Sequence, residues 1–367
     1  MVDVHLKHIT KKFGRTIAVN DLTLDVEDGE FIVLLGPSGC GKTTTLRIIA
    51  GLERPTSGRV YFGDRDVTDL PPRKRNVSMV FQSYAVWPHM TVYDNIAFPL
   101  RIKKVPKEEI DRKVKWAASL LQIDDLLNRY PHQLSGGQRQ RVAVARAIVV
   151  EPDVLLMDEP LSNLDALLRV KMRSELKKLQ RRIKVTTIYV THDQVEAMTM
   201  GDRIAVMNKG RLMQVGTPYE VYHHPANLFV AGFVGTPQMN FLEANVTESD
   251  RGVVLDVGDF TIEPTPGQAT LLRDYIGKTV IVGIRPEHIY PADRVPTGIT
   301  HRQEVNGVVD FVERLGSDTI IHVNTGSNIV VVKVSGVYNT DIGDKIRVVV
   351  DVDKMHVFRK GDGKAVF

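Results

Sequence analysis

The residues with the clearest chemical potential lie at positions 36–43, which read G-P-S-G-C-G-K-T. This spacing matches a phosphate-binding loop, because its glycines let backbone N–H groups face a phosphate chain and the following helix adds partial positive charge. Lys42 is placed to reach the outer phosphates of a nucleoside triphosphate, and the Thr43 hydroxyl is placed to bind Mg²⁺. A glycine-rich turn without a ligand is the alternative. The other candidate nucleotide contacts in this loop are Ser38, Gly39, Cys40, Gly41 and Thr44.

A pair of carboxylates ends a short apolar run at residues 154–159, V-L-L-M-D-E. Neighbouring side chains of a strand point to opposite sides, so the two acids can take different roles. Asp158 is placed to hold Mg²⁺, and Glu159 is placed to act as the base for an attacking water. Alone this run is weak support for a site, but downstream of a phosphate-binding loop it predicts hydrolysis of a nucleoside triphosphate.

A second anion-binding motif is predicted at residues 134–138, L-S-G-G-Q. It stands at the start of an expected helix, where free N–H groups and the Ser135 hydroxyl can face a phosphate. A helix cap with flexible glycines is the alternative reading. The candidate phosphate contacts here are Ser135, Gly136, Gly137 and Gln138.

The three motifs together resemble those of the ABC transporter ATPases, for which L-S-G-G-Q is the family signature. The resemblance implies that two chains pair head to tail, so that the phosphate loop of one and the signature of the other enclose one ATP with its Mg²⁺. It implies catalytic roles for Glu159, His192, Gln82 and Lys42. It implies metal contacts for Thr43, Gln82 and Asp158.

Several single positions fit the same resemblance, although each would be unremarkable alone. Phe13 corresponds to the aromatic residue that stacks on adenine, and Gln82 to the glutamine that contacts Mg²⁺ and the attacking water. His192 follows an expected strand and corresponds to the histidine that touches the γ-phosphate. Residues 162–165, S-N-L-D, correspond to the loop that crosses the dimer interface. The family commonly has alanine where Asn163 stands, a departure that puts little of the resemblance in question but would alter contacts between the two sites.

The segment 83–90, S-Y-A-V-W-P-H-M, is unusually aromatic for a loop. The resemblance implies a groove in this region that receives a short helix of a membrane subunit, and Tyr84, Trp87 and Met90 would suit an apolar anchor in it. A local hydrophobic plug beneath the helical region is the alternative.

The elements that must position these motifs follow an α/β pattern in the first part of the chain. Continuous apolar runs at 31–35 and 154–157 predict strands buried on both faces, and the loop at 36–43 should open a helix. Residues of about 84–150 carry helical signals, and 167–183 read as a charged amphipathic helix. Alternation of strands and helices predicts a largely parallel sheet.

The sequence changes character after about Gly235. Short β-branched segments separated by turn residues predict a small all-β domain, an OB-like barrel, over 236–367, with the ATPase domain at 1–235. Residues 283–288 read G-I-R-P-E-H, and in this position they look like the ATPases of the carbohydrate-importer branch, of the maltose-transporter kind. Importers of polyamines, iron, sulphate or molybdate carry related extensions and remain alternatives.

The composition sets limits on the class of protein. The net charge of +4 and the 25% of charged residues are ordinary for a soluble globular chain, and we expect no nucleic-acid partner. The single cysteine, Cys40, rules out an internal disulfide. No apolar stretch is long enough to span a bilayer. We therefore expect a peripheral subunit on the cytoplasmic face of the cell membrane.

The expected partners are two transmembrane permease subunits, a second copy of the chain or a paralogue, and, indirectly, an extracellular or periplasmic solute-binding protein. A DNA-repair or translation ATPase of the same superfamily is a rival, but it would need a long coiled-coil insertion or two fused nucleotide domains, and the chain shows neither. An exporter subunit and a regulatory sensor are further rivals.

Overall fold

The computed structural model describes residues 2–250 and 252–367. They form two compact units, residues 1–218 and 219–367. Two short helices, α7 (Pro218–His223) and α8 (Leu228–Phe233), lie between this division and the domain boundary expected after residue 235. Each unit has its own hydrophobic core, so each is described separately.

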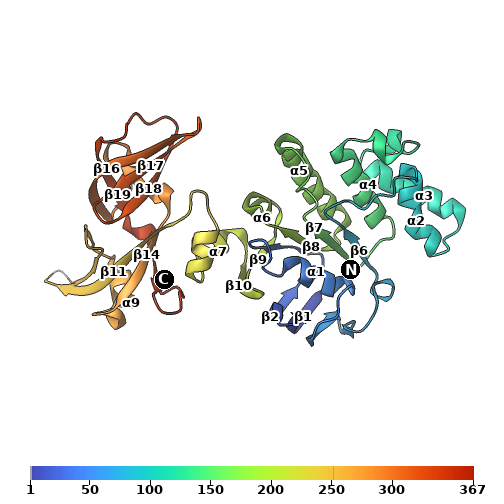
Figure 1. The fold of residues 1–367 in the computed structure, drawn as a ribbon, viewed down its shortest axis with the longest axis horizontal. Coiled ribbons are helices and arrows are strands. Elements are labelled where there is room, and N and C mark those ends of the chain that lie inside the picture. Colours follow the sequence, from blue (N-terminus) through green and yellow to red (C-terminus); the bar gives the residue numbers. More distant parts are fainter. Residues whose placement is uncertain (1, 251) are drawn as a thin grey trace. The chain divides into compact units, whose positions relative to one another are not determined.

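The centre of the first unit is a six-stranded sheet in the order β10-β9-β3-β8-β7-β6 (Figure 1). All neighbouring pairs are parallel except β10 and β9. Phe31–Leu35 and Val154–Asp158 are buried at every position, as expected for strands covered on both faces. The strands are β3 (Phe31–Leu35), β6 (Val77–Val80), β7 (Val154–Asp158), β8 (Thr186–Thr191), β9 (Arg203–Asn208) and β10 (Arg211–Gly216).

A second, antiparallel sheet of the first unit has the order β2-β1-β4-β5. Its alternating apolar side chains, among them Val4, Leu6 and Leu24, pack with α1 and the central sheet in one core. The strands are β1 (Val4–Phe13), β2 (Thr16–Val26), β4 (Ser57–Phe62) and β5 (Arg65–Asp66). The helices beside the two sheets are α1 (Lys42–Ala50), α5 (Ala166–Ile183) and α6 (Gln194–Met200).

Three helices gather at one end of the first unit (Figure 1): α2 (Val92–Ile102), α3 (Lys107–Leu120) and α4 (Gly136–Ile148). They fall within the helical region expected at about 84–150. In the aromatic segment before them, Tyr84 is only 6% exposed, and Trp87 packs on the Phe98 ring with centroids 4.4 Å apart. The Arg146 guanidinium lies over the Trp87 ring, 4.5 Å from its centroid. Tyr84 thus belongs to the core beneath the helices, and Trp87 is partly exposed.

The second unit is predominantly β, as expected. Two five-stranded antiparallel sheets, β13-β12-β11-β14-β20 and β15-β19-β16-β17-β18, share one apolar core. The first sheet holds β11 (Asn240–Ser249), β12 (Gly252–Asp256), β13 (Thr261–Ile262), β14 (Thr279–Ile284) and β20 (His356–Arg359). The second holds β15 (Ile289–Pro291), β16 (Arg302–Arg314), β17 (Asp318–Asn324), β18 (Ile329–Ser335) and β19 (Lys345–Asp351), and α9 is Pro266–Leu272.

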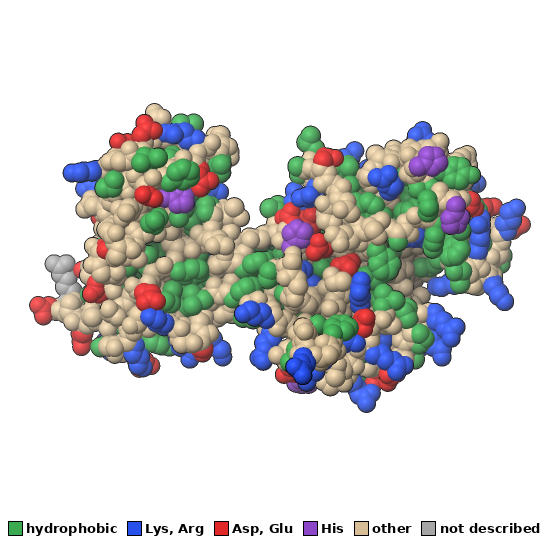
Figure 2. Space-filling model, in the orientation of Figure 1, with side chains coloured by type: hydrophobic (Ala, Val, Ile, Leu, Met, Phe, Trp, Pro, Cys, Tyr) green, Lys and Arg blue, Asp and Glu red, His purple; other side chains and the backbone are tan. Residues whose placement is uncertain are grey.

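The surface carries charges of both signs. Figure 2 shows Lys and Arg side chains interspersed with Asp and Glu on the visible face of each unit. Such a mixed surface is typical of solvated globular proteins. Within the part of the chain that the structure describes, no helix is both long and apolar enough to cross a membrane.

Candidate functional site

The phosphate-binding loop connects β3 to α1 at the carboxyl edge of the central sheet. Gly41 caps α1 in the left-handed region at φ 105°, and a Cβ there would lie 2.4 Å from the Ala18 carbonyl oxygen. Gly36 is equally constrained, because a Cβ would lie 2.3 Å from the Met207 carbonyl oxygen. Both positions therefore require glycine, and the loop wraps closely around the start of α1.

Lys42 is buried within this loop. Its ammonium donates to the carbonyl oxygens of Gly36 at 2.7 Å and Pro37 at 3.0 Å, and it lies 3.7 Å from the Cys40 sulfur. Burial raises the pKa of the Cys40 thiol, which keeps it protonated and weakly reactive at neutral pH. The Lys42 ammonium therefore lies inside the loop, where the loop would surround the phosphates.

The Thr43 hydroxyl donates to the Asp158 carboxylate at 2.9 Å, which joins the first turn of α1 to the end of β7. Asp158 is 9% exposed, and burial raises the pKa of its carboxyl, an effect opposed by the Thr43 hydrogen bond. The two predicted Mg²⁺ contacts are therefore side by side. Hydroxyl and carboxylate oxygens are hard donors of the type that Mg²⁺ prefers.

Glu159 directly follows β7 and has left-handed backbone geometry with φ 44°. A non-glycine residue in this region carries strain of about 1–3 kcal/mol, and such strain is concentrated at functional sites. Its N–H donates to the Val190 carbonyl at 3.0 Å, and its carboxylate lies 3.1 Å from Nδ1 of His192 at the end of β8. The His192 side chain is 55% exposed and that of Glu159 20%, so both reach the surface.

The interface loop at 162–165 is bonded to the segment that carries Gln82. The Gln82 amide donates to the Ser162 hydroxyl at 3.3 Å, and the Asn163 amide donates to the Gln82 carbonyl at 2.8 Å. The Ser162 hydroxyl in turn donates to the Glu159 carbonyl at 2.9 Å. Asn163, which departs from the family's usual alanine, therefore joins two of the predicted site loops.

Phe13 lies at the end of β1, opposite Thr16 of β2. The residue is 48% exposed, and the Lys11 ammonium lies 4.8 Å from the ring centroid. An exposed aromatic face flanked by a cation is suited to stacking on a heterocyclic base.

The signature residues lie at the start of α4. Ser135 caps the helix, since its hydroxyl accepts from the Gln138 N–H at 3.3 Å and the Gln138 side chain accepts from the Ser135 N–H at 2.9 Å. Gly137 has to be small, because a Cβ would lie 2.8 Å from Leu168. Ser135 is exposed.

The predicted site residues thus fall into two groups. Hydrogen bonds join Thr43 to Asp158, Glu159 to His192, and Gln82 to the interface loop, which is bonded to Glu159. Among the described residues, no hydrogen bond or ion pair joins Ser135 or Gln138 to the phosphate-binding loop.

One feature near the site escaped the sequence analysis. Glu196 on α6 is buried, and its carboxylate accepts from the Tyr189 hydroxyl at 2.8 Å and the Thr191 hydroxyl at 2.7 Å. Thr191 also accepts from the Asp193 N–H at 3.0 Å, so this network fixes the chain on both sides of His192. The sequence does carry a signal for the start of α6, because Asp193 is followed three residues later by Glu196, as at a capped helix start.

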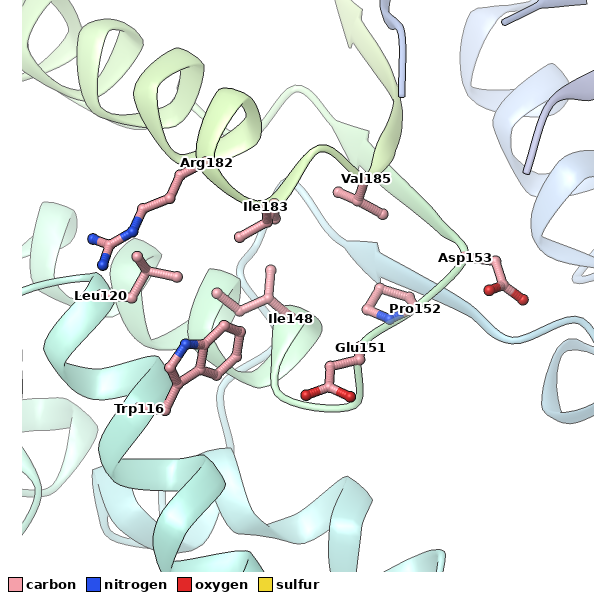
Figure 3. A pocket seen from close by; sticks show the side chains of 9 residues that line it. All are labelled: Trp116, Leu120, Ile148, Glu151, Pro152, Asp153, Arg182, Ile183 and Val185. Carbon is pink, nitrogen blue, oxygen red and sulfur yellow. The ribbon is translucent and has the colours of Figure 1, made fainter. Parts of the chain in front are cut away.

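A cavity of about 430 Å³ lies elsewhere in the first unit (Figure 3). Pro152 and Asp153 precede β7, and Val185 precedes β8, so this cavity is at the amino edge of the central sheet. Ligands of open α/β sheets bind at the carboxyl edge. The cavity contains none of the predicted site residues. Its lining is Trp116, Leu120, Ile148, Glu151, Pro152, Asp153, Arg182, Ile183 and Val185.

The family profile described as ABC transporter matches residues 19–162, that of the MalK OB fold domain matches 235–289, and that of the TOBE domain matches 282–358. A trehalose/maltose import ATP-binding protein of Thermococcus litoralis is 56% identical over the full length of both chains. An oligosaccharides import ATP-binding protein of Bacillus subtilis is 45% identical over 98% of each chain.

Among solved structures, a dimeric ATP-binding cassette in a post-hydrolysis state with ADP and Pi is similar, with a TM-score of 0.52 and 34% identity. The match covers 59% of this chain and 98% of that one. ATP hydrolysis is the activity of proteins with this cassette. Both the phosphate-loop fold and the OB-like C-terminal region expected from the sequence are confirmed. The chain belongs to the ABC transporter family of ATP-hydrolysing subunits, in the group that carries MalK OB fold and TOBE domains.

Proposed function

We propose that this chain is the ATP-hydrolysing subunit of an importer for sugars or oligosaccharides. The observation that carries the proposal is the full-length likeness, at 56% identity, to a trehalose/maltose import protein, which extends through the second unit as well as the ATPase unit. Importers of another solute are the alternative. The ATPase unit alone does not separate them, because none of its predicted site residues is assigned to a solute.

In the proposed reaction, Phe13 stacks on the adenine and the loop at 36–43 surrounds the phosphates. The Lys42 ammonium exchanges the Gly36 and Pro37 carbonyls, its present acceptors, for oxygens of the β- and γ-phosphates. Backbone N–H groups at the start of α1 stabilise the same charge. Loop residues 38–41 and Thr44 complete this contact surface.

Mg²⁺ fits the Thr43 hydroxyl and Asp158 carboxylate and would screen the charge that develops on the phosphates. The described residues hold no group of three or more His, Cys, Asp or Glu side chains suited to a metal ion. Mg²⁺ would therefore bind together with the nucleotide, with Gln82 as a further contact.

Glu159 is the proposed base. Its carboxylate is held beside His192, so it can take a proton from a water that approaches the γ-phosphate, while His192 and Gln82 orient that water. The strained backbone at Glu159 fixes the direction of the carboxylate.

The signature end supplies the other half of the site from a second chain. Ser135, Gly136, Gly137 and Gln138 of one copy would contact the γ-phosphate held by the other copy. Hydrolysis therefore waits for closure of the pair, and loss of the γ-phosphate opens it. The second chain is another copy or a paralogue.

Two transmembrane permease subunits are the proposed membrane partners, with a solute-binding protein acting outside the membrane. The subunit would lie on the cytoplasmic face of the cell membrane. The partly exposed Trp87, near Gln82, is proposed to contact a permease helix, whereas buried Tyr84 supports the segment from within. We also propose that residues 1–235 act as the ATPase domain and 236–367 as a regulatory domain.

The experiment that tests this function is isolation of the tagged chain from detergent-solubilised native membranes, followed by mass spectrometry. Co-purification of two polytopic permeases, with a sugar-binding receptor, supports the proposal. Trp87→Ala should reduce permease recovery while ATP affinity stays unchanged. Recovery of soluble partners alone, such as ribosomes or DNA-bound complexes, would contradict the transport role.

A further inference from the structure

The second unit contains a cavity that ATP hydrolysis does not use. Its volume is about 420 Å³, which falls within the range of ~300–1,000 Å³ typical of small-molecule sites. All its lining residues belong to residues 219–367, whereas the predicted ATP-site residues all belong to residues 1–218. The lining is Tyr222, Thr236, Glu287, Tyr290, Pro291, Arg294, Pro296, Lys333, Val334 and Ser335.

The cavity is built around the G-I-R-P-E-H segment, which the ATPase mechanism leaves unexplained. Arg285 of this segment is buried and lies 3.6 Å from the centroid of the Tyr222 ring. Its guanidinium donates to the Val234 carbonyl at 2.7 Å and to the Tyr222 carbonyl. The Tyr222 hydroxyl donates to the Glu287 carboxylate. One wall of the cavity is therefore held rigidly by a buried cation.

The wall combines aromatic and hydrogen-bonding groups. Tyr222 and Tyr290 supply aromatic rings, and both lie partly buried. Glu287 accepts one hydrogen bond from Tyr222, and a carboxylate has further lone pairs for hydroxyl donors. Ser335, at the end of β18, adds an exposed hydroxyl. Aromatic faces with nearby acceptors suit a polyhydroxylated ring, which has apolar C–H faces and polar edges.

Positive charge predominates around the cavity. Arg294 donates to the Val337 carbonyl at 3.1 Å, and no carboxylate of the described residues lies within ion-pair distance of it. The Lys333 ammonium is 3.7 Å from Asp318, a long and partly exposed pair. Among the lining residues, Arg294 and Lys333 carry positive charge and Glu287 carries negative charge, and Asp318 offsets part of the Lys333 charge. This balance suits a ligand that carries at least one negative charge.

We propose that this cavity binds a sugar phosphate. The sugar ring would lie against Tyr222 and Tyr290, with its hydroxyls donating to Glu287. Its phosphate would accept charge-assisted hydrogen bonds from Arg294 and Lys333. A neutral sugar would leave Arg294 without a counter-charge, and inorganic phosphate would leave the aromatic wall uncovered.

Isothermal titration of the full chain with glucose 6-phosphate, without ATP, tests the proposal. Glucose 6-phosphate should bind. Glucose and inorganic phosphate should each bind with an affinity at least about tenfold lower. Arg294→Ala and Lys333→Ala should each weaken binding about 10- to 100-fold, the loss expected for one charged hydrogen bond of about 1.5–3 kcal/mol.

Arg347→Ala is the matched control, because Arg347 is an exposed arginine of β19 that pairs with Glu304 outside this cavity. It should leave affinity for glucose 6-phosphate unchanged. Thermal unfolding of each variant separates a lost ligand contact from a damaged fold.

Three outcomes would overturn the inference: no binding of glucose 6-phosphate, equal binding of inorganic phosphate, or unchanged affinity in both cation variants. Because binding is measured without ATP, the result is independent of the proposed import function. ATP hydrolysis by the same preparation, measured separately, shows whether the first unit is intact.

Discussion

The phosphate-binding loop and the signature differ in how many other predicted site groups of the same chain lie bonded around them. Around the loop, Lys42, Thr43 and Asp158 already bond to partners within the first unit, and Glu159 lies against His192. At the signature, the hydrogen bonds of Ser135 among the described residues stay within its own helix start, to Gln138 and Arg139. One end holds a nearly complete set of hydrolytic groups, and the other presents a capped helix start with an exposed hydroxyl.

This difference predicts that ATP binding and the activation of hydrolysis depend on different motifs. In the proposed mechanism, a single chain has the groups to bind ATP, whereas catalysis needs charge stabilisation from the signature of another chain. Changes at the loop should therefore impair binding and hydrolysis together. Changes at the signature should impair hydrolysis while binding survives.

Among the changes that separate the loop from the signature, the largest effect is expected for Lys42→Ala. Removing the ammonium from the phosphate loop should lower kcat by about 10²–10³-fold, as for loss of one preorganised donor, and should also weaken ATP binding. A nucleotide-binding titration and a phosphate-release assay check both parts. Normal ATP affinity in this variant would contradict the proposed difference between the loop and the signature, because it would show that the loop does not hold the phosphates.

A smaller loss is expected for Ser135→Ala. Hydrolysis should fall about 10²-fold because one donor to the transition state is lost, while ATP affinity of the isolated chain stays within about twofold. The helix also loses its cap, at a cost of about 1 kcal/mol in free energy of unfolding.

Thr265→Ala is the matched control, since Thr265 forms the same capping box with Gln268 at the start of α9 in the second unit. It should cost similar stability and leave hydrolysis unchanged. Equal loss of hydrolysis in both variants would mean that Ser135 acts only as a cap.

Acid should weaken Mg²⁺ binding through Asp158. Burial raises the pKa of this carboxyl, so protonation begins at a higher pH than for an ordinary aspartate, and the protonated form cannot bind Mg²⁺. The Mg²⁺ concentration for half-maximal hydrolysis should therefore rise as pH falls toward that raised pKa. Asp158→Asn should show weak Mg²⁺ activation with no such pH trend, and an unchanged trend in it would contradict the assignment.

The smallest effect is expected for Trp116→Ala at the amino edge of the sheet. The side chain is 39% exposed, so its loss should lower the free energy of unfolding by only about 1 kcal/mol. Hydrolysis should stay within about twofold of the unaltered chain, as measured by phosphate release. A loss comparable with that of Ser135→Ala would show that the amino edge takes part in the reaction.

The contiguous motifs and the strands that precede them were predictable from the sequence. The loop at 36–43, the acids at 158–159 and the helix start at 135 each depend on local spacing, and the structure has a strand or helix where each was expected. The β-branched segments separated by turn residues likewise predicted strands after residue 235, and the second unit is built from such strands.

The contacts between motifs were not predictable. The bond from Asn163 to the Gln82 carbonyl, the burial of Tyr84 and the Tyr189–Glu196 bond join residues through tertiary packing. The φ of 44° at Glu159 also has no local signal, because glutamate does not favour that region. Such features appear only when separate strands end beside one another.

The most direct test of the two-chain site is the mass of Glu159→Gln in solution with saturating MgATP. This variant keeps the shape of the side chain and removes its basicity, so ATP should bind without being hydrolysed and should hold two chains together. Light scattering should report a dimer with ATP and a monomer with ADP, with hydrolysis reduced about 10²–10⁴-fold. A monomer that still hydrolyses MgATP would contradict both the base assignment and the shared site.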